Sequence, residues 1–199
     1  MSRPATVILA GGASARLGQC KALADLGGTT PLSELLRASG ATRATLVVGG
    51  AHSDAIRAAL PAGVEFVHNE LWRSGRLASV RCAVRARPGL DLCLAPVDVP
   101  LVPAEVFGAL ARAWEEAGSP TRGWLAPWVL VEGQRRYGHP VVLGRALLAE
   151  ILAEPEELPL KVFRTRAVPL LGAEVHSHSV LEDLDTPEDL ARMRLRRGF

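Results

Sequence analysis

The chain has 199 residues, of which 48% are hydrophobic and 22% are charged, and its formal net charge is +2. This length supports one well-buried core, so we expect a single domain over residues 1–199. The small net charge excludes a general electrostatic attraction as an argument for nucleic acid or membrane partners, and we expect neither.

The cysteines and the first apolar run indicate the cellular compartment of the protein. The three cysteines are odd in number and form no Cys-x-x-Cys pair, which favours free thiols in a reducing compartment. The apolar run over residues 6–10 ends at two glycines, so it is too short for an export signal or a membrane span. We therefore expect a cytoplasmic protein.

Strand-like apolar runs alternate with segments of helical period in the first part of the chain. The predicted elements, in order, are a strand over 6–10, a helix over 31–39, a strand over 44–48, a helix over 53–60, a strand over 64–67, a helix over 75–87, a strand over 90–95 and a helix over 104–117. This alternation predicts a parallel sheet with helices on both faces. Ligands bind outside the carboxyl ends of such strands, so the loops after Ala10 and Ala95 are expected to face one cleft.

The pattern changes after residue 123. Strands over 124–131 and 139–143, joined by a polar turn over 132–136, are predicted to close the sheet on one side. They are followed by a helix over 144–152, a surface loop over 155–159, strands over 167–171 and 174–180, and a last helix over 187–197.

The loop after the first strand reads LAGGASARLGQCK, from Leu9 to Lys21. Polyphosphate is dense in charge, so it binds where backbone N–H groups are reachable and where Arg and Lys supply positive charge. Glycines followed by Arg16 and Lys21 meet both needs. The Walker pattern fails because no Lys-Ser/Thr pair follows Gly18, and the dinucleotide fingerprint fails because Gly11 and Gly12 are adjacent. A generic strand-to-helix turn explains the glycine pair but not the order of the cations.

The string resembles the LAGG-x-S-x-R-x-G-x-x-K signature of the nucleotidyltransferases of molybdenum-cofactor biosynthesis, and every fixed position is met. The resemblance implies an α/β fold of the nucleotide-diphospho-sugar transferase (GT-A-like) kind, three-layered α/β/α and Rossmann-like, with a mostly parallel central sheet. It also implies that Arg16 and Lys21 neutralise the phosphates during attack on the α-phosphorus. The loop residues that would contact the nucleoside triphosphate are Leu9, Ala10, Gly11, Gly12 and Ser14.

Asp98 follows the strand predicted over 90–95, in the string Asp-Val-Pro-Leu-Val. A carboxylate there supplies the hard oxygen ligand that Mg²⁺ requires. An Asp shortly before Pro100 is also typical of a turn. Because the family places its metal aspartate in a D-x-P-L-V string, the resemblance implies Mg²⁺ as cofactor and Asp98 as its ligand.

A second acidic cluster begins at Glu182 and leads into the last helix. Thr186 suits an N-cap and the residues after it suit a first helical turn. Asp183 and Asp185 alternate with Leu184, so an extended segment places both on one face. The string resembles the family's D-I-D-T-P-E-D-L motif, which implies Asp185 first and Asp183 second as a further metal ligand. The alternative is that both solvate the end of a strand.

Three further elements carry polar residues. Asn69 and Ser79 lie in a string that resembles the family's N-x-x-W-x-x-G-x-x-x-S element. Their neutral polar side chains suit contacts with the base or ribose; the alternative is that they belong to a loop and a helix cap. Trp72 is expected to pack rather than to stack on a ligand. This version is closer to the cytidylyltransferase than to the guanylyltransferase branch. His139, in Gly-His-Pro, is expected to contact the acceptor. His176 and His178 alternate on one predicted strand face but lack a third metal ligand, so we expect surface residues.

The segment over 158–166 departs from the Gly-Asp-Lys-Gly-Ala-Arg-like element of the cytidylyltransferases, so Lys161, Arg164 and Arg166 stay open as acceptor contacts. We expect a Mg²⁺-dependent transferase of a nucleoside monophosphate from CTP or GTP to a phosphorylated, molybdopterin-type acceptor, with a molybdoenzyme or chaperone as a further partner. The alternatives are transfer to a sugar or polyol phosphate, or a nucleotide-binding regulatory protein without turnover.

Overall fold

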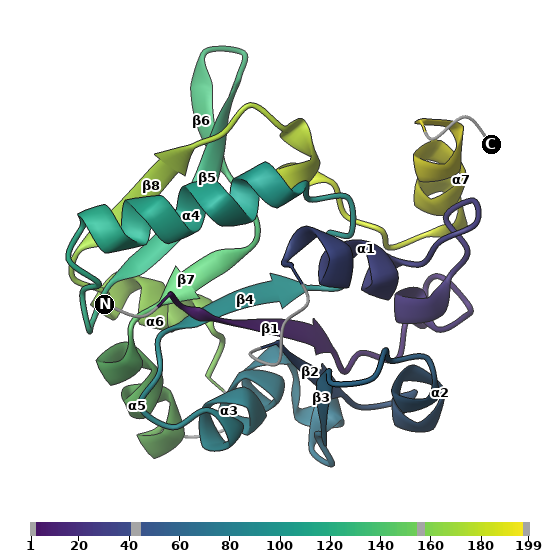
Figure 1. Cartoon of the computed structure of the whole chain (residues 1–199), viewed down its shortest axis with the longest axis horizontal. Helices are drawn as coiled ribbons and strands as arrows, with labels where there is room; N and C mark the ends of the chain where they lie inside the picture. Colours follow the sequence, from purple (N-terminus) through teal and green to yellow (C-terminus); the bar gives the residue numbers. More distant parts are fainter. Residues whose placement is uncertain (1–2, 41–44, 155–157, 197–199) are drawn as a thin grey trace.

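The fold is seen in a computed structural model that describes residues 3–40, 45–154 and 158–196. Its sheet has the order β3-β2-β1-β4-β7-β5-β6, and β8 pairs with β5 outside this path (Figure 1). The strands are β1 (Ala5–Ala10), β2 (Leu46–Gly49), β3 (Glu65–His68), β4 (Leu92–Pro96), β5 (Trp124–Val131), β6 (Gln134–Tyr137), β7 (Val141–Leu143) and β8 (Leu170–Glu174).

The sheet is mostly parallel, as predicted. Strands β1 to β4 are parallel to one another, β7 is antiparallel to β4 and β5, β6 is antiparallel to β5, and β8 is parallel to β5. Only β6 and β7, among the described strands, therefore run against the rest. All residues of β2 and β4 are buried, as expected of strands covered on both faces.

Helices cover both faces of the sheet, which gives the three-layer α/β/α architecture (Figure 1). One face carries α1 (Pro31–Ala38), α2 (Ser53–Ala58) and α4 (Ala104–Glu116), whose Leu35, Ile56 and Trp114 belong to one apolar cluster. The other face carries α3 (Arg76–Ala86), α5 (Arg145–Ala153) and α6 (Lys161–Arg166).

The remaining elements lie near the carboxyl ends of the strands. They are the short 3₁₀ helices η1 (Lys21–Leu23), η2 (Trp72–Ser74) and η3 (His178–Leu181) and the last helix α7 (Pro187–Arg196). Helix α7 stands apart from the three layers in Figure 1, beside the chain that follows the glycine loop. No helix in the described ranges is both long and apolar enough to cross a bilayer.

Two sequence-based predictions of local structure are wrong. The polar turn expected over 132–136 is only two residues long, since Glu132 and Gly133 have φ of 51° and 74° and the chain then continues as β6. The polarity that suggested a turn belongs to an exposed strand. Of the strand expected over 174–180, only Glu174 lies in a strand, as the last residue of β8. Glu174 pairs with Trp128 of β5, and this is the last pair between β8 and β5. His176 and His178 therefore share no strand face, although both are exposed, as expected.

Other boundaries differ by a few residues. The predicted strand over 44–48 corresponds to β2, and residue 44 lies outside the described residues. Most of the loop predicted over 155–159 also lies outside them. The segment over 158–166, whose structure the sequence left open, contains α6 with the buried Phe163.

Candidate active site

A first cavity, of about 360 Å³, lies at the carboxyl ends of β1 and β4. It joins the loop after Ala10 to the loop after Ala95, as expected for an open α/β sheet. Its lining comprises Leu9, Ala10, Gly11, Gly12, Ser14, Cys20, Lys21, Ala22, Trp72, Gly75, Arg76, Ser79, Pro96, Val97 and Asp98. All five loop residues predicted to contact a triphosphate thus face one cavity.

The glycine loop is shaped by close backbone contacts. A Cβ on Gly11 would lie 2.9 Å from Ser79 Oγ, and a Cβ on Gly50 would lie 2.3 Å from the carbonyl oxygen of Gly11. Ser14 then closes the loop, because its Oγ accepts a hydrogen bond of 3.1 Å from the backbone N–H of Lys21. A side chain at Gly11 would therefore displace Ser79 of α3, and one at Gly50 would collide with the backbone of Gly11, so both glycines serve packing in addition to any contact with phosphate.

Arg16 and Lys21, the two predicted phosphate-binding cations, share one carboxylate. Lys21 Nζ lies 2.6 Å from Asp185 Oδ1, and Arg16 Nη2 lies 3.0 Å from Asp185 Oδ2. Lys21 is only 12% exposed, whereas Arg16 is 72% exposed. The hydrogen bond from Lys21, followed by the charges of both cations, lowers the pKa of Asp185. No pattern in the sequence predicts that a proposed metal ligand pairs with these cations.

A second cavity, also of about 360 Å³, adjoins the first. Its lining comprises Arg16, Arg76, Asp98, Tyr137, Gly138, His139, Val180, Leu181, Asp183 and Asp185. Arg76 and Asp98 line both cavities and so mark the place where the two meet. Arg16, expected beside the glycine loop's ligand, lines this second cavity.

Asp98 is held from two sides. Its Oδ2 lies 3.2 Å from Arg76 Nη2, and its backbone oxygen accepts a hydrogen bond of 2.7 Å from Leu184 N. Its Oδ1 is buried and has no hydrogen-bond partner among the described residues. An unpaired buried carboxylate oxygen is costly, so this atom calls for a cation or a donor.

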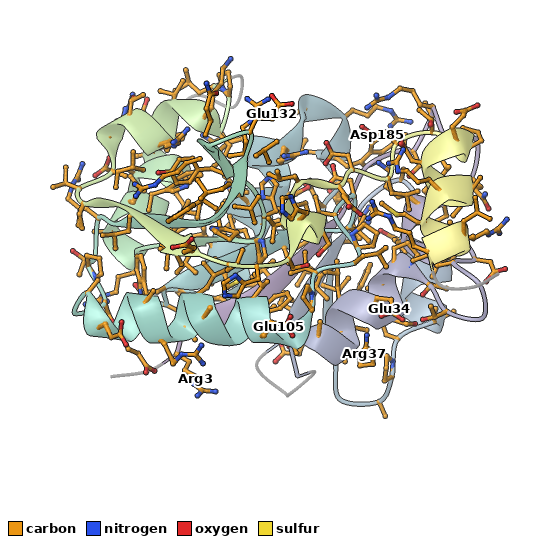
Figure 2. All side chains as sticks on the ribbon, turned by 90° about the horizontal axis from the view of Figure 1, so that it is seen from above. Arg3, Glu34, Arg37, Glu105, Glu132 and Asp185 are labelled. Atoms are coloured by element: carbon orange, nitrogen blue, oxygen red, sulfur yellow. The ribbon has the colours of Figure 1, made fainter. Side chains whose placement is uncertain are left out.

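The bond to Leu184 brings the closing acidic segment beside Asp98. Leu184 is fully buried in a small apolar cluster with Leu17, Leu26 and Met193, which ties α7 to the chain after the glycine loop. Asp183 and Asp185 flank this anchor, and Figure 2 shows Asp185 beside α7, on the ribbon that leads into it. Burial, followed by the charges of Asp98 and Asp185, raises the pKa of Asp183.

The start of α7 confirms the predicted capping. Asp189 N donates to Thr186 Oγ1 at 3.2 Å, and Thr186 N donates to Asp189 Oδ2 at 2.9 Å. These reciprocal bonds form a capping box, with Asp in place of the usual Glu. They fix the chain directly after Asp185.

Asn69 and Ser79 form a pair behind the glycine loop. The amide nitrogen of Asn69 donates to Ser79 Oγ at 3.0 Å, and its amide oxygen accepts from Leu71 N at 3.1 Å. Ser79 lines the first cavity, whereas Asn69 is buried outside its lining. Trp72 lines the cavity too, with Arg73 stacked on its ring at 4.3 Å. Asn69 is thus placed to orient Ser79.

His139 lies in the second cavity, on the side predicted for the acceptor. Its backbone N–H donates to Val180 O at 2.9 Å, and a Cβ on Gly138 would lie 2.2 Å from the same oxygen. The glycine of Gly-His-Pro is therefore required for this close approach. Burial and the charge of Arg76 lower the pKa of His139, so its imidazole is neutral at neutral pH.

The structure adds Arg76 and Tyr137, which sequence reasoning missed, and separates two of the three residues that it left open. Arg76 could have been found from its position directly after the Trp-x-x-Gly string, whereas Tyr137 carried no signal. Arg164 stacks on Tyr137 at 5.4 Å and so lies next to the second cavity. Arg166 instead pairs with Glu154.

No group of three or more His, Cys, Asp or Glu side chains in the described part of the chain is arranged to hold a metal ion. Asp98 and Asp185 are instead engaged by Arg76, Lys21 and Arg16. Asp98, Asp183 and Asp185 nonetheless line one cavity.

Residues 6–169 match the family model of the MobA-like NTP transferase domain. The chain belongs to the MobA-like NTP transferase family. Among the curated members, the molybdenum cofactor guanylyltransferase of Xanthomonas euvesicatoria pv. vesicatoria (strain 85-10) is 40% identical over 114 residues. That alignment spans 55% of each protein, about half the length of the relative.

Solved structures share the fold of this MobA-like chain. The molybdopterin-guanine dinucleotide biosynthesis protein A of Archaeoglobus fulgidus has a TM-score of 0.75 at 20% identity, covering 97% of this chain and 98% of that one. Rv0371c of Mycobacterium tuberculosis H37Rv, in a complex with manganese, has a TM-score of 0.72 at 23% identity, covering 98% and 99% of the two chains. The chain is thus a nucleotidyltransferase by family, with the α/β fold that its first loop implied.

Proposed function

We propose that this MobA-like transferase moves the nucleoside monophosphate of GTP or CTP to a phosphorylated acceptor of the molybdopterin type and releases pyrophosphate. The observation that carries the proposal is the meeting of two cavities at Arg76 and Asp98. One cavity contains the glycine loop and Lys21, which suits a triphosphate. The other contains Gly138 and His139 and suits a second substrate.

The reaction needs no covalent intermediate. An oxygen of the acceptor phosphate attacks the α-phosphorus, the bond from that phosphorus to the bridging oxygen breaks, and the bond's electrons leave with pyrophosphate. In this proposal the backbone around Gly11 and Gly12 holds the phosphates, while Lys21 and Arg16 offset the charge that develops on the leaving group. Ser79, oriented by Asn69, contacts the base or ribose.

Two features support a divalent cation among the described carboxylates, although Asp98 and Asp185 are paired with Arg76, Lys21 and Arg16 in this structure. Asp98 has a buried oxygen without a partner, and the pKa of Asp183 is raised by burial and then by the charges of Asp98 and Asp185, as expected where carboxylates lie close together. Oxygen ligands suit Mg²⁺, and the manganese complex of Rv0371c supports a hard divalent ion. We propose Asp98, Asp185 and Asp183 as the residues that hold Mg²⁺, which when bound would offset phosphate charge.

The choice between GTP and CTP has support on both sides. The curated relative is a guanylyltransferase, while the string around Asn69 and Ser79 is closer to the cytidylyltransferase form. A molybdoenzyme or its chaperone would be the destination of either product.

The test is pyrophosphate release by the purified protein with Mg²⁺, each of the four common nucleoside triphosphates, and a panel of acceptors. The panel includes molybdopterin, sugar phosphates and polyol phosphates. Release with GTP or CTP that depends on molybdopterin supports the proposal. Release only with a sugar or polyol phosphate, or tight triphosphate binding without release with any acceptor, contradicts it.

A further inference from the structure

Arg76 stands at the junction of the two cavities, and neither the family model nor the relatives' names assign it a role. It is the first residue of α3 and follows Gly75, whose φ of 101° is a conformation that favours glycine. The turn at Gly75 directs the chain so that the side chain of Arg76 lines both cavities. The side chain is 51% exposed.

The guanidinium group of Arg76 has N–H donors that its ion pair with Asp98 does not use. Its one ion pair within the described residues is with Asp98 Oδ2, at 3.2 Å through Nη2. A guanidinium carries five N–H donors in a rigid fork that matches phosphate. Nη1 and Nε are thus left for a second anion. Lys21, by contrast, is only 12% exposed and already bonds Asp185. Among the described residues, Arg16 also pairs through Nη2 alone, with Asp185, but it lines only the second cavity.

The proposed reaction brings two negatively charged groups together at this place. Two phosphate groups must approach until the attacking oxygen lies about 3–3.5 Å from phosphorus, and their charges repel. The second cavity contains three carboxylates, Asp98, Asp183 and Asp185, against the two guanidinium groups of Arg16 and Arg76, and His139 is neutral. The Mg²⁺ proposed above would offset two of these negative charges. Among the lining residues of the two cavities, Arg76 is the cation that both share, so it lies where the two phosphate groups would meet.

We propose that Arg76 binds the phosphate of the acceptor in the second cavity and so selects phosphomonoesters over uncharged alcohols. This inference rests on the proposed function. It makes Arg76 a specificity residue for the second substrate rather than part of the triphosphate site. The competing role is purely local: Arg76 neutralises Asp98 and contacts no substrate.

Calorimetric titration can separate these roles with inorganic phosphate as the probe. The protein is first saturated with Mg²⁺ and a non-hydrolysable analogue of GTP or CTP, so that the first cavity is filled, and phosphate is then titrated. The variants are R76A, R76K and the control R73A. R73A removes the same charge three residues earlier, at a position that lines neither cavity.

We expect wild type and R73A to bind phosphate with equal affinity, R76A to bind it at least about tenfold more weakly, and R76K to lie between them. Nucleotide affinity should change less than about twofold in R76A. Equal phosphate binding by R76A and wild type, no phosphate binding by wild type, or loss of nucleotide binding in R76A would each overturn the inference. Failure of every analogue to bind wild type would instead overturn the proposed function. Thermal unfolding of each variant shows whether it is folded.

Discussion

The two cavities each have a volume of about 360 Å³, but the residues that line them are distributed differently along the sequence. The first is lined mainly by the loops after β1 and β4 and the start of α3, and its shape depends on backbone contacts such as those of Gly11 and Gly50. The second takes side chains from the glycine loop, α3, the end of β6 and the segment before α7. In the proposed function, the triphosphate would be held by a local motif, whereas the acceptor site would be assembled from distant parts of the chain.

Asp98 belongs to both cavities, so its loss should have the largest effect. Asp98→Ala is expected to lower kcat by about a thousandfold or more, because it removes the carboxylate between the two substrates. Steady-state pyrophosphate release measures this, with circular dichroism to verify the fold. Asp54→Ala, on the exposed surface of α2, is the control for loss of one acidic residue. Wild-type turnover in D98A would refute a role for Asp98 at the junction.

Lys21→Ala should come next and should affect the first cavity alone. Lys21 is nearly buried beside the glycine loop, so its removal should lower kcat by about a hundredfold or more while acceptor affinity stays the same. Lys21→Arg keeps the charge and should recover part of the loss. An unchanged kcat would contradict the assignment, and a selective loss of acceptor affinity would move Lys21 to the second cavity.

Gly11→Ala tests whether the first cavity is shaped by backbone packing. The new Cβ would lie 2.9 Å from Ser79 Oγ, whereas a Cβ on Gly12 meets nothing within 4 Å. We expect G11A to be destabilised by about 1–3 kcal/mol and G12A to keep wild-type stability, as measured by urea unfolding. The double variant G11A/S79A should recover part of the loss. Equal stabilities of G11A and G12A would show that packing does not require the first glycine.

Arg164→Ala should act on the second cavity only, with an increase of a few-fold in the acceptor KM and no change in nucleotide KM. Arg164 reaches this cavity through its stack on Tyr137, an exposed cation–π contact of modest strength. Arg166→Ala is the matched control, because Arg166 lies on the same helix α6 but pairs with Glu154 at the end of α5. Its acceptor KM should stay at the wild-type value. The same increase in both variants would argue against a specific role for Arg164.

Asp183→Asn should have the smallest of these effects, and it should raise the stability of the fold. The pKa of Asp183 is raised in the fold, so the ionised carboxylate destabilises the folded state and wild type loses stability as pH rises through that pKa. D183N should therefore have a Tm about 1–2 °C above wild type at pH 7, and the two should converge below about pH 3, where Asp183 is protonated in both states. Added Mg²⁺ should raise the Tm of wild type more than that of D183N. A Tm below wild type at pH 7 would contradict this account.

The sequence predicts the first cavity better than the second. The residues of LAGGASARLGQCK are contiguous, and they follow an uninterrupted apolar run that predicts a buried strand. The position of the first cavity and the class of ligand proposed for it can therefore both be predicted from a local pattern. The pairing of Arg16 and Lys21 with Asp185 could not be predicted, since it joins residues 164 positions apart, as Lys21 and Asp185 are. Likewise, β6 is polar on both faces because it is exposed, and that removes the alternation by which strands are recognised.

The shared carboxylate of Asp185 has a consequence for how a nucleotide enters. Lys21 and Arg16 are held in place by an internal counter-ion, the carboxylate of Asp185. If they bind the triphosphate as proposed, the triphosphate exchanges with this carboxylate and does not bind to unpaired cations. Its affinity is then the difference between two sets of ion pairs, which favours an anion of higher charge over a singly charged one. The same exchange releases the carboxylate of Asp185, which then becomes available to the proposed Mg²⁺.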